Sequence, residues 1–331
     1  MTEPWPTPPA PAPAPALRCP DASLHPTLGT VAAVVVTYHA DAAGIGDRLA
    51  RLAAQVDAVV VVDNGSGPDT VAALRAAAEA LPAVSLVLNP DNQGLAAAQN
   101  QGMAAALAAG FAWLLLMDDD STPAPDMVAA LARVEAAHPG AFGLLAPRLR
   151  YPDSGRVPGF LTAHGRGLWP RKRPAPESGI LADPVFVIAS GSLIRAEAVR
   201  AVGPMRADFF IDYLDVEYCF RLTAAGVRLA VVGDAVLDHA LGRQTAHRVL
   251  GRTVWCSNHA PFRCRAMARN RLRLWRAWGR RHPGWMAQDL LALVVQLWRV
   301  LALEDDGRAK ATAILRGLRE GLASPPASAA R

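Results

Sequence analysis

Short apolar runs rich in β-branched residues alternate with helical segments over residues 31–118, and this alternation restricts the possible folds most. The runs read VAAVVVTY, AVVVVDNGS, VSLVLN and WLLLMDDD, and each ends in turn or acidic residues. Runs of this kind predict buried strands. Strands that alternate with helices at this spacing predict an α/β fold with a mostly parallel sheet and helices on both faces. Ligands of such sheets bind beyond the carboxyl ends of the strands.

Three consecutive aspartates, Asp118–Asp120, follow the fourth of these runs. Like charges repel one another, and burial disfavours their ionised forms. A hard divalent cation removes both problems, and Mg²⁺ takes one or two carboxylates together with substrate phosphates. If the extended geometry persists, Asp118 and Asp120 point the same way because side chains alternate along a strand. The alternative is that Asp120 caps the next helix, but a cap needs one carboxylate and not three.

Other polar residues at predicted strand or helix ends have two interpretations each. Asp63 and Asn64 lie in a turn sequence, or the Asp63 carboxylate accepts from a nucleobase N–H. Asn92 caps the helix that Gly94 opens, or the helix start binds a phosphate. Asp215 is a partner of a helix dipole or a general base that takes a proton from a hydroxyl. His239 is a structural histidine or a neutral imidazole ligand for a metal.

The regular alternation ends after Leu149. Residues 151–183 are rich in Gly, Pro and Arg, contain Trp169, and are predicted to form a long loop that could close over a ligand. VFVIASGSLIR is predicted to be a strand. FFIDYLDVEYCFRLTAAG is predicted to be a strand end that passes into a helix, and VRLAVVGDAVLDH a further strand. Helices are predicted from about Ala260 onward.

The net charge of +5 is concentrated late in the chain, where arginines crowd between Arg243 and Arg281. Such a run is a solvated face, a nucleic-acid site or a membrane-surface helix. The interleaved tryptophans favour a helix on an anionic membrane surface, and nothing else in the sequence calls for nucleic acid. The sequence predicts no membrane span, because Gln296 and Arg299 interrupt the best apolar stretch, 290–303.

The N-terminal residues and the cysteines suggest an intracellular protein. Residues 1–28 are rich in Pro and Ala and are predicted to form a disordered tail. No basic region followed by an apolar core marks a signal peptide. The 4 cysteines form no CxxC pair, so we expect free thiols in a reducing compartment.

The motifs in order, VVVTYH, VVVVDNGS, NPDNQGLAAAQNQG, WLLLMDDDS, ASGSLI, FFIDYLDVEYCFR and AVLDHALG, resemble the family-2 inverting glycosyltransferases of the GT-A fold. The similarity is greatest to the bacterial rhamnosyltransferase group and the related galactofuranosyltransferases, and it spans residues 31–242. It implies a glycosyltransferase domain over 29–242, with a nucleotide-binding half (29–120) and an acceptor half (121–242). A basic and aromatic helical extension follows over 243–331.

The resemblance also implies roles for the matching residues. Those expected to bind the donor are Thr37, Tyr38, Asp63, Asn64, Asn92, Gly94, Asn100, Asp118 and Asp119. Those expected to hold Mg²⁺ or Mn²⁺ are Asp118, Asp120 and His239. Asp215 is expected to be the catalytic base and Glu217 a second catalytic acid that orients the site. Gly191 and Ser192 are expected in a turn beside the donor or acceptor, and Trp169 lies in the loop that could close over the donor. One departure is that Cys264–Ala268 replace the tyrosines common before Arg269-Asn270.

The predicted activity is transfer of L-rhamnose from dTDP-rhamnose to a glycan or polyprenyl-linked acceptor in cell-surface polysaccharide synthesis. Another donor such as UDP-galactofuranose is the alternative. A sugar nucleotidyltransferase would need a glycine-rich, basic phosphate loop, which VVVTYHADAAGIG lacks. A non-catalytic glycan-binding module on the membrane predicts loss of Asp215 or of the Asp118 and Asp120 pair, and all three are present. The expected location is cytoplasmic, peripheral on the inner face of the membrane. The oligomeric state stays open, including a homo-oligomer.

Overall fold

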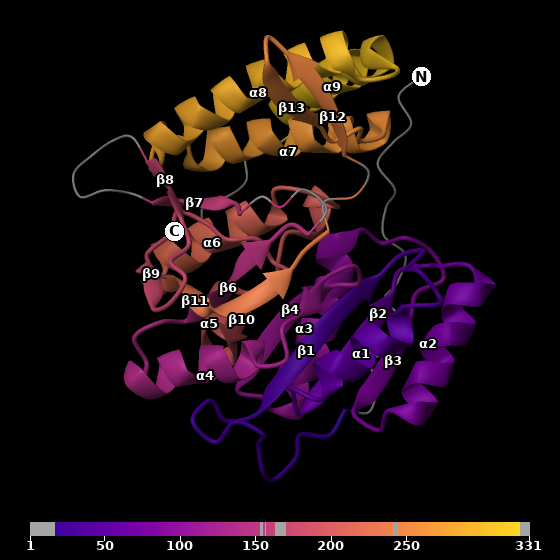
Figure 1. The fold of residues 1–331 in the computed structure, drawn as a ribbon, viewed down its shortest axis with the longest axis vertical. Helices are drawn as coiled ribbons and strands as arrows, with labels where there is room; N and C mark the ends of the chain where they lie inside the picture. Colours follow the sequence, from indigo (N-terminus) through magenta and orange to yellow (C-terminus); the bar gives the residue numbers. More distant parts are fainter. Residues whose placement is uncertain are drawn as a thin grey trace.

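One central sheet organises the computed structural model, which describes residues 17–152, 155, 157–162, 170–240, 242 and 244–324. The sheet has the strand order β3-β2-β1-β4-β10-β6-β11-β5, and β9 pairs with β11 (Figure 1). Its strands are β1 (Val31–Thr37), β2 (Ala58–Asp63), β3 (Val84–Leu88), β4 (Trp113–Asp118), β5 (Thr122–Pro123), β6 (Leu144–Arg150), β9 (Ile180–Ala182), β10 (Leu193–Arg195) and β11 (Leu229–Asp238). The four strands β1 to β4 run parallel, as predicted.

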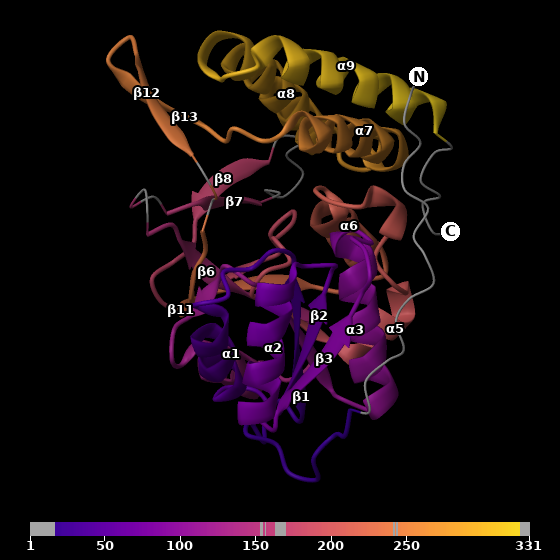
Figure 2. The same ribbon diagram turned by 90° about the vertical axis from the view of Figure 1, so that its right-hand side faces the viewer.

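Helices flank this sheet (Figures 1 and 2). They are α1 (Ile45–Ala53), α2 (Pro68–Ala80), α3 (Leu95–Ala109), α4 (Met127–Ala137), α5 (Ala196–Val202), α6 (Leu214–Ala224) and the 3₁₀ turn η1 (Ala207–Phe209). All residues of β1 and β2 are buried, which explains their continuous apolar sequences. Gly102 lets α3 approach β1, because a Cβ there would lie 2.3 Å from Cγ1 of Val34. The predicted α/β sheet flanked by helices is confirmed.

The second half of the sheet differs from the sequence predictions. Of the predicted strand at 185–195, only β10 is regular, because the chain turns at Gly191, whose φ is 81°. The predicted strand end before α6 is instead η1, followed by residues in the left-handed region. The predicted long loop contains the hairpin β7 (Gly159–Thr162) and β8 (Arg171–Pro174) as well as β9. Trp169 lies outside the described residues.

The C-terminal region forms a layer over one end of the sheet domain (Figures 1 and 2). It consists of the hairpin β12 (Thr245–Val249) and β13 (Arg252–Cys256), and of the helices α7 (Pro261–Trp278), α8 (Pro283–Leu303) and α9 (Gly307–Ala323). The helical extension predicted from the sequence is therefore present, and the hairpin before it was not predicted.

The arginines of α7 are mainly internal, which corrects their interpretation as a membrane-facing surface. Arg269, Arg271 and Arg273 are each about 95% buried. Arg271 pairs with Asp289 of α8 at 3.0 Å, and Arg265 pairs with Glu320 of α9 at 2.6 Å. Burying a guanidinium is tolerated only when it is paired and hydrogen-bonded. These arginines therefore join α7 to its neighbours.

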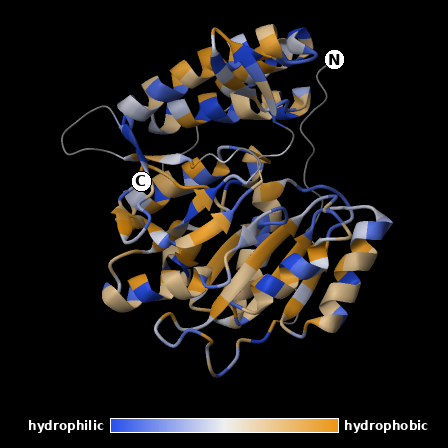
Figure 3. Ribbon diagram, in the orientation of Figure 1, coloured by the Kyte–Doolittle hydropathy of each residue, from blue (hydrophilic) through white to orange (hydrophobic). Residues whose placement is uncertain are grey.

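Helix α8 corrects the prediction that no stretch is long enough to cross a membrane. Among the described residues it is the one helix that is long and apolar enough to cross a membrane by length and composition, with 21 residues and a mean hydropathy of 1.5. Only 11% of its 18-residue apolar segment is buried inside the protein. Figure 3 shows hydrophobic residues along this helix at the outer edge of the molecule. Its exposed apolar residues are Leu290, Leu291, Val294, Trp298 and Leu301.

Part of the predicted N-terminal tail contacts the domain. Asp57 accepts hydrogen bonds from Ser23 Oγ at 3.1 Å and from the backbone N–H of Leu24 at 2.7 Å. Leu28 is 5% exposed and belongs to the hydrophobic core. The tail prediction is therefore wrong for residues 17–28, and residues 1–16 lie outside the described residues. The 4 cysteines are free thiols, as expected.

Candidate active site

A cleft of about 780 Å³ lies where the carboxyl ends of the parallel strands meet the start of α7. Tyr38 follows β1, Asn64 follows β2, and Asp118–Asp120 follow β4. Opposite them the cleft is lined by the loop 210–215, by His239 after β11, and by Arg263 near the start of α7. The cleft thus occupies the position expected for ligands of a parallel sheet.

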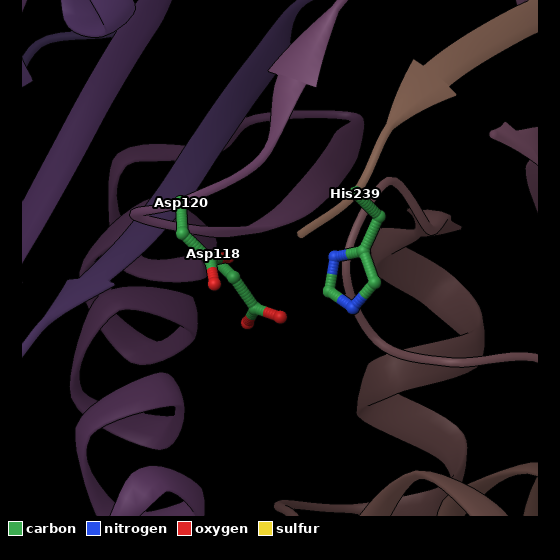
Figure 4. Close-up of side chains that lie close together, drawn as sticks. All are labelled: Asp118, Asp120 and His239. Carbon is green, nitrogen blue, oxygen red and sulfur yellow. The ribbon is translucent and has the colours of Figure 1, made fainter. Parts of the chain in front are cut away.

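Asp118, Asp120 and His239 form a cluster that could hold a metal ion. One ligand atom from each of them lies within 4.8 Å of the others. In Figure 4 the two aspartates extend from the end of β4 toward the imidazole ring. Nδ1 of His239 lies 2.8 Å from Oγ of Ser121, which orients the ring and leaves Nε2 for a cation. Two hard oxygens and one imidazole suit Mn²⁺ or Mg²⁺.

A chain of serines supports this cluster. Oγ of Ser190 donates to Oγ of Ser121 at 2.9 Å and accepts from the backbone N–H of Asp118 at 3.1 Å. Ser190 therefore connects the start of the acidic run with the residue that orients His239. Ser190 was not predicted from the sequence, although it lies in the same ASGS motif as the predicted residues Gly191 and Ser192.

The electrostatics of the acidic run favour a bound cation. Burial, together with the neighbouring charges of Asp120, Asp119 and Asp215, raises the pKa of Asp118 to about 7. Burial also raises the pKa of Asp119 to about 6, with Asp120 as the second cause. For His239, burial lowers the pKa, so its neutral ligand form dominates at neutral pH. A divalent cation would restore the ionised carboxylates and bind the neutral imidazole.

Asp215 lines the same cleft at the beginning of α6. Burial raises its pKa to about 6, while the N–H of Val216, 2.9 Å from Oδ1, works in the opposite direction. A carboxyl group with this pKa is mostly ionised at neutral pH and still accepts a proton from a reacting hydroxyl. Its negative charge also acts on Asp118, so the two carboxylates are close enough to interact.

The loop that carries Asp215 has an unusual backbone. Phe210, Asp212 and Tyr213 have φ values of 64°, 62° and 63°, in the left-handed region that side chains rarely adopt. Nδ2 of Asn270, which is fully buried, lies 2.7, 2.9 and 3.0 Å from the carbonyl oxygens of Phe209, Ile211 and Asp212. Asn270 thus binds the backbone on both sides of Phe210.

Two further contacts hold this loop. Arg263 donates two hydrogen bonds to the carboxylate of Asp212, each of 2.9 Å. The hydroxyl of Tyr213 donates to Asp289 and accepts from Arg271, both at 2.7 Å. Helices α7 and α8 therefore position the loop that precedes Asp215, which lines the same cleft as the candidate metal ligands.

Comparison with known proteins identifies the family to which this chain belongs. The sequence pattern of Glycosyl transferase family 2 matches residues 32–202, which is just over half of the chain. The chain belongs to glycosyl transferase family 2.

Two curated relatives match most of this family-2 glycosyltransferase. The dTDP-rhamnosyl transferase RfbF of Shigella flexneri is 26% identical over 238 residues, which are 72% of this chain and 77% of RfbF. The galactofuranosyltransferase GlfT1 of Mycolicibacterium smegmatis is 29% identical over 238 residues, or 67% of this chain and 74% of GlfT1.

A solved structure supports the GT-A fold. The crystal structure of GalNAc-T7 with UDP, GalNAc and Mn²⁺ superimposes with a TM-score of 0.58 at 13% identity. The match covers 88% of this chain but only 56% of GalNAc-T7, so this chain spans little more than half of that protein. The predicted fold family is therefore confirmed.

Eight of the sixteen predicted site residues meet in the cleft of this family-2 enzyme. They are Tyr38, Asn64, Asn92, Asp118, Asp119, Asp120, Asp215 and His239. Asn64 and Asn92 are joined by a 3.0 Å hydrogen bond, and Oδ1 of Asn92 also accepts the N–H of Gly94 at 2.8 Å. Asp119 accepts the N–H of Tyr38 at 3.3 Å. These contacts fix the side of the cleft that residues 29–120 contribute.

Thr37 and Asp63 are buried and do not belong to the residues described as lining the cleft. The hydroxyl of Thr37 donates to Oδ1 of Asp63 at 2.9 Å, and the N–H of Ser66 donates to Oδ2 at 2.9 Å. Both oxygens of Asp63 therefore have partners inside the protein. In this structure the pair supports the strand ends of β1 and β2, and a contact of Asp63 with a nucleobase stays a prediction.

Glu217 is not brought to the cleft formed by the described residues. It is 2% exposed, and its carboxylate oxygens lie 3.0 and 2.9 Å from Nε of Arg221. Arg221 in turn donates to the carbonyl oxygens of Val202 and Pro204. The structure therefore gives Glu217 a role in holding α6 against the end of α5, in place of the predicted catalytic role.

The remaining predicted residues also act on the backbone around the site. Asn100 exchanges two hydrogen bonds of 2.8 Å with the backbone of Met205. Gly94, at φ 84°, leaves room for the Phe210 ring. Gly191 donates its N–H to the carbonyl of Leu116, while Ser192 is 1% exposed. None of these four predicted residues lines the cleft that the described residues form.

Proposed function

We propose that this protein is an inverting glycosyltransferase that moves a sugar from a nucleotide donor to a glycan or polyprenyl-linked acceptor. The observation that carries the proposal is that Asp215 and the Asp118, Asp120 and His239 cluster line one cleft. The acceptor hydroxyl oxygen attacks the anomeric carbon, and the bond from that carbon to the diphosphate oxygen breaks. Asp215 receives the hydroxyl proton, and the nucleoside diphosphate leaves. A single displacement inverts the anomeric centre.

The metal cluster has a defined part in this proposal. Asp118, Asp120 and His239 would hold Mg²⁺ or Mn²⁺, which stabilises the charge of a departing diphosphate as a Lewis acid. Arg263 lies near enough to Asp118 to interact with its charge. Its guanidinium is already paired with Asp212, so it holds the cleft wall in place beside the diphosphate.

We propose dTDP-rhamnose as the donor, on the support of the similarity to RfbF, with UDP-galactofuranose as the second candidate from the similarity to GlfT1. We expect dTDP-rhamnose to stabilise the protein most in a panel with UDP-galactofuranose and GDP-mannose. A ligand at 100 times its Kd stabilises by about 2.7 kcal/mol, or roughly 4 °C in Tm for a protein of this size. Thermal unfolding with Mn²⁺ measures this shift, and EDTA should remove most of it. If no sugar nucleotide gave a metal-dependent shift, the proposed activity would be wrong.

The raised pKa of Asp215 predicts the pH dependence of transfer. The base works as a carboxylate, and burial raises its pKa to about 6. The transfer rate should therefore rise about tenfold for each pH unit below 6 and level off above pH 7. The experiment measures kcat at saturating donor and Mn²⁺, with donor affinity measured at each pH to separate binding from chemistry. A kcat that does not change between pH 5 and 7 contradicts the role of Asp215.

We further propose that the enzyme is cytoplasmic and binds the inner face of the membrane through the exposed apolar side of α8. Exposed apolar residues on one helix face bind the interface between lipid head groups and acyl chains. Val294→Glu should reduce binding to phosphatidylglycerol vesicles several-fold in a flotation assay. Val157→Glu is the matched control, because Val157 is a similarly exposed valine, 53% against 56%, outside α8. Equal binding by both variants and the wild type would count against membrane contact through α8.

A further inference from the structure

A second pocket, of about 470 Å³, lies between β13, α7 and α8. Three of its lining residues, Gln244, Ser257 and His259, also line the active-site cleft. The two spaces are therefore adjacent, on the side of the cleft that the C-terminal region covers. The volume falls within the range of about 300–1,000 Å³ that small-molecule sites occupy.

Helix α8 presents opposite faces to this pocket and to the surroundings. Ala292, Gln296, Arg299 and Val300 line the pocket and recur at helical spacing. The exposed apolar residues, such as Val294, Trp298 and Leu301, lie on the other side of the helix. A molecule with a polar group and a hydrocarbon part could place the polar group in the pocket and the hydrocarbon part against the exposed apolar side of α8.

Arg299 brings a positive charge to the pocket. Its Nε is buried and has no hydrogen-bond partner among the described residues, and no ion pair within them includes its guanidinium. The carboxylate that lines the same pocket, Glu304, is 4% exposed and pairs with Lys310 at 2.9 Å. A buried N–H of a guanidinium without a partner is unfavourable, and it suits the oxygens of a phosphate or carboxylate.

We propose that this pocket binds the anionic group of the acceptor, with Arg299 as its charge partner. This group is the phosphate that links a glycan to its lipid or the carboxylate of an acidic sugar. The proposal rests on the proposed function, since it assumes that an acceptor enters the adjacent cleft. Trp255, Met267 and Val300 supply apolar walls for the carbon atoms next to the charge.

Binding of small anions to the full chain tests this site directly. Methyl phosphate, farnesyl phosphate and glucuronic acid are titrated by calorimetry, with and without dTDP and Mn²⁺ to fill the active-site cleft. We expect at least one of them to bind the wild type in both conditions, and Arg299→Gln to weaken that binding at least tenfold. The phosphates and the carboxylate distinguish a lipid-linking phosphate from an acidic sugar.

Two further variants keep the test sharp. Arg308→Gln removes the same charge at an exposed position of α9 outside the pocket and should bind like the wild type. Ala292→Phe fills the pocket without removing the charge and should also weaken binding. The proposal is overturned if no anion binds the wild type, or if Arg299→Gln binds the anions as the wild type does. Metal-dependent binding of sugar nucleotides, measured on the same samples, tests the proposed function separately.

Discussion

Asp215→Asn should lower the transfer rate by about 10²–10⁴-fold, which is the usual contribution of a general base. The amide has nearly the shape of the carboxylate but does not accept the acceptor proton. The donor site and the metal cluster stay intact, so the Kd for the donor nucleotide with Mn²⁺ should change little. Steady-state transfer, together with calorimetry of nucleotide binding, separates the two effects. Transfer that persists at more than a tenth of the wild-type rate would remove Asp215 from the role of base.

Glu217→Gln is the matched control for this prediction, because it neutralises an acidic residue on the same helix. The structure pairs Glu217 with Arg221 in a buried position, so the loss should be in stability. Breaking a buried ion pair by removing one partner costs about 3–5 kcal/mol. The folded protein should retain most of its kcat. A kcat loss equal to that of Asp215→Asn would restore Glu217 to the catalytic role that the family resemblance implied.

The first half of the fold could be predicted because local sequence and tertiary structure agree there. The strands β1, β2 and β4 are buried on both faces, so each is a continuous apolar run with a sharp polar end. Those polar ends meet by topology alone, since parallel strands bring their carboxyl ends to one edge. Asp118 and Asp120 were therefore placed correctly from their sequence positions. His239 joins them through β11, and only the family resemblance indicated that.

Other parts of the site could not be predicted because they depend on tertiary contacts. A polar residue at a strand end can point into the cleft or support the backbone below it. Tyr38 and Asn64 line the cleft, whereas the hydroxyl of Thr37 and the carboxylate of Asp63 bind each other. The α7 arginines likewise form a basic stretch in the sequence. Their burial depends on acidic and carbonyl partners that lie 18 to 65 positions away, such as Asp289 for Arg271.

Asn270→Ala should lower kcat by about 10²-fold, although Asn270 does not line the cleft formed by the described residues. Three side-chain-bearing residues of the loop 210–213 hold left-handed φ values, and each such residue costs about 1–3 kcal/mol that surrounding contacts must offset. The amide of Asn270 supplies contacts to three carbonyl oxygens there. Without them the loop should relax and move Asp215 at the start of α6. A displacement of about 1 Å at a catalytic group is enough for a loss of this size.

Asn100→Ala is the matched control, because it also removes an asparagine that makes hydrogen bonds of 2.8 Å with backbone groups, in this case those of Met205. Both variants should unfold at lower temperature, since both leave buried backbone groups without partners. Only Asn270→Ala should lose kcat out of proportion to the folded fraction, with the Kd for donor and Mn²⁺ within a few-fold of the wild type. If the two variants lose activity in parallel with stability, Asn270 supports the fold alone. A selective loss of kcat instead means that α7 controls the position of the base, which links the C-terminal helices to the chemistry of the cleft.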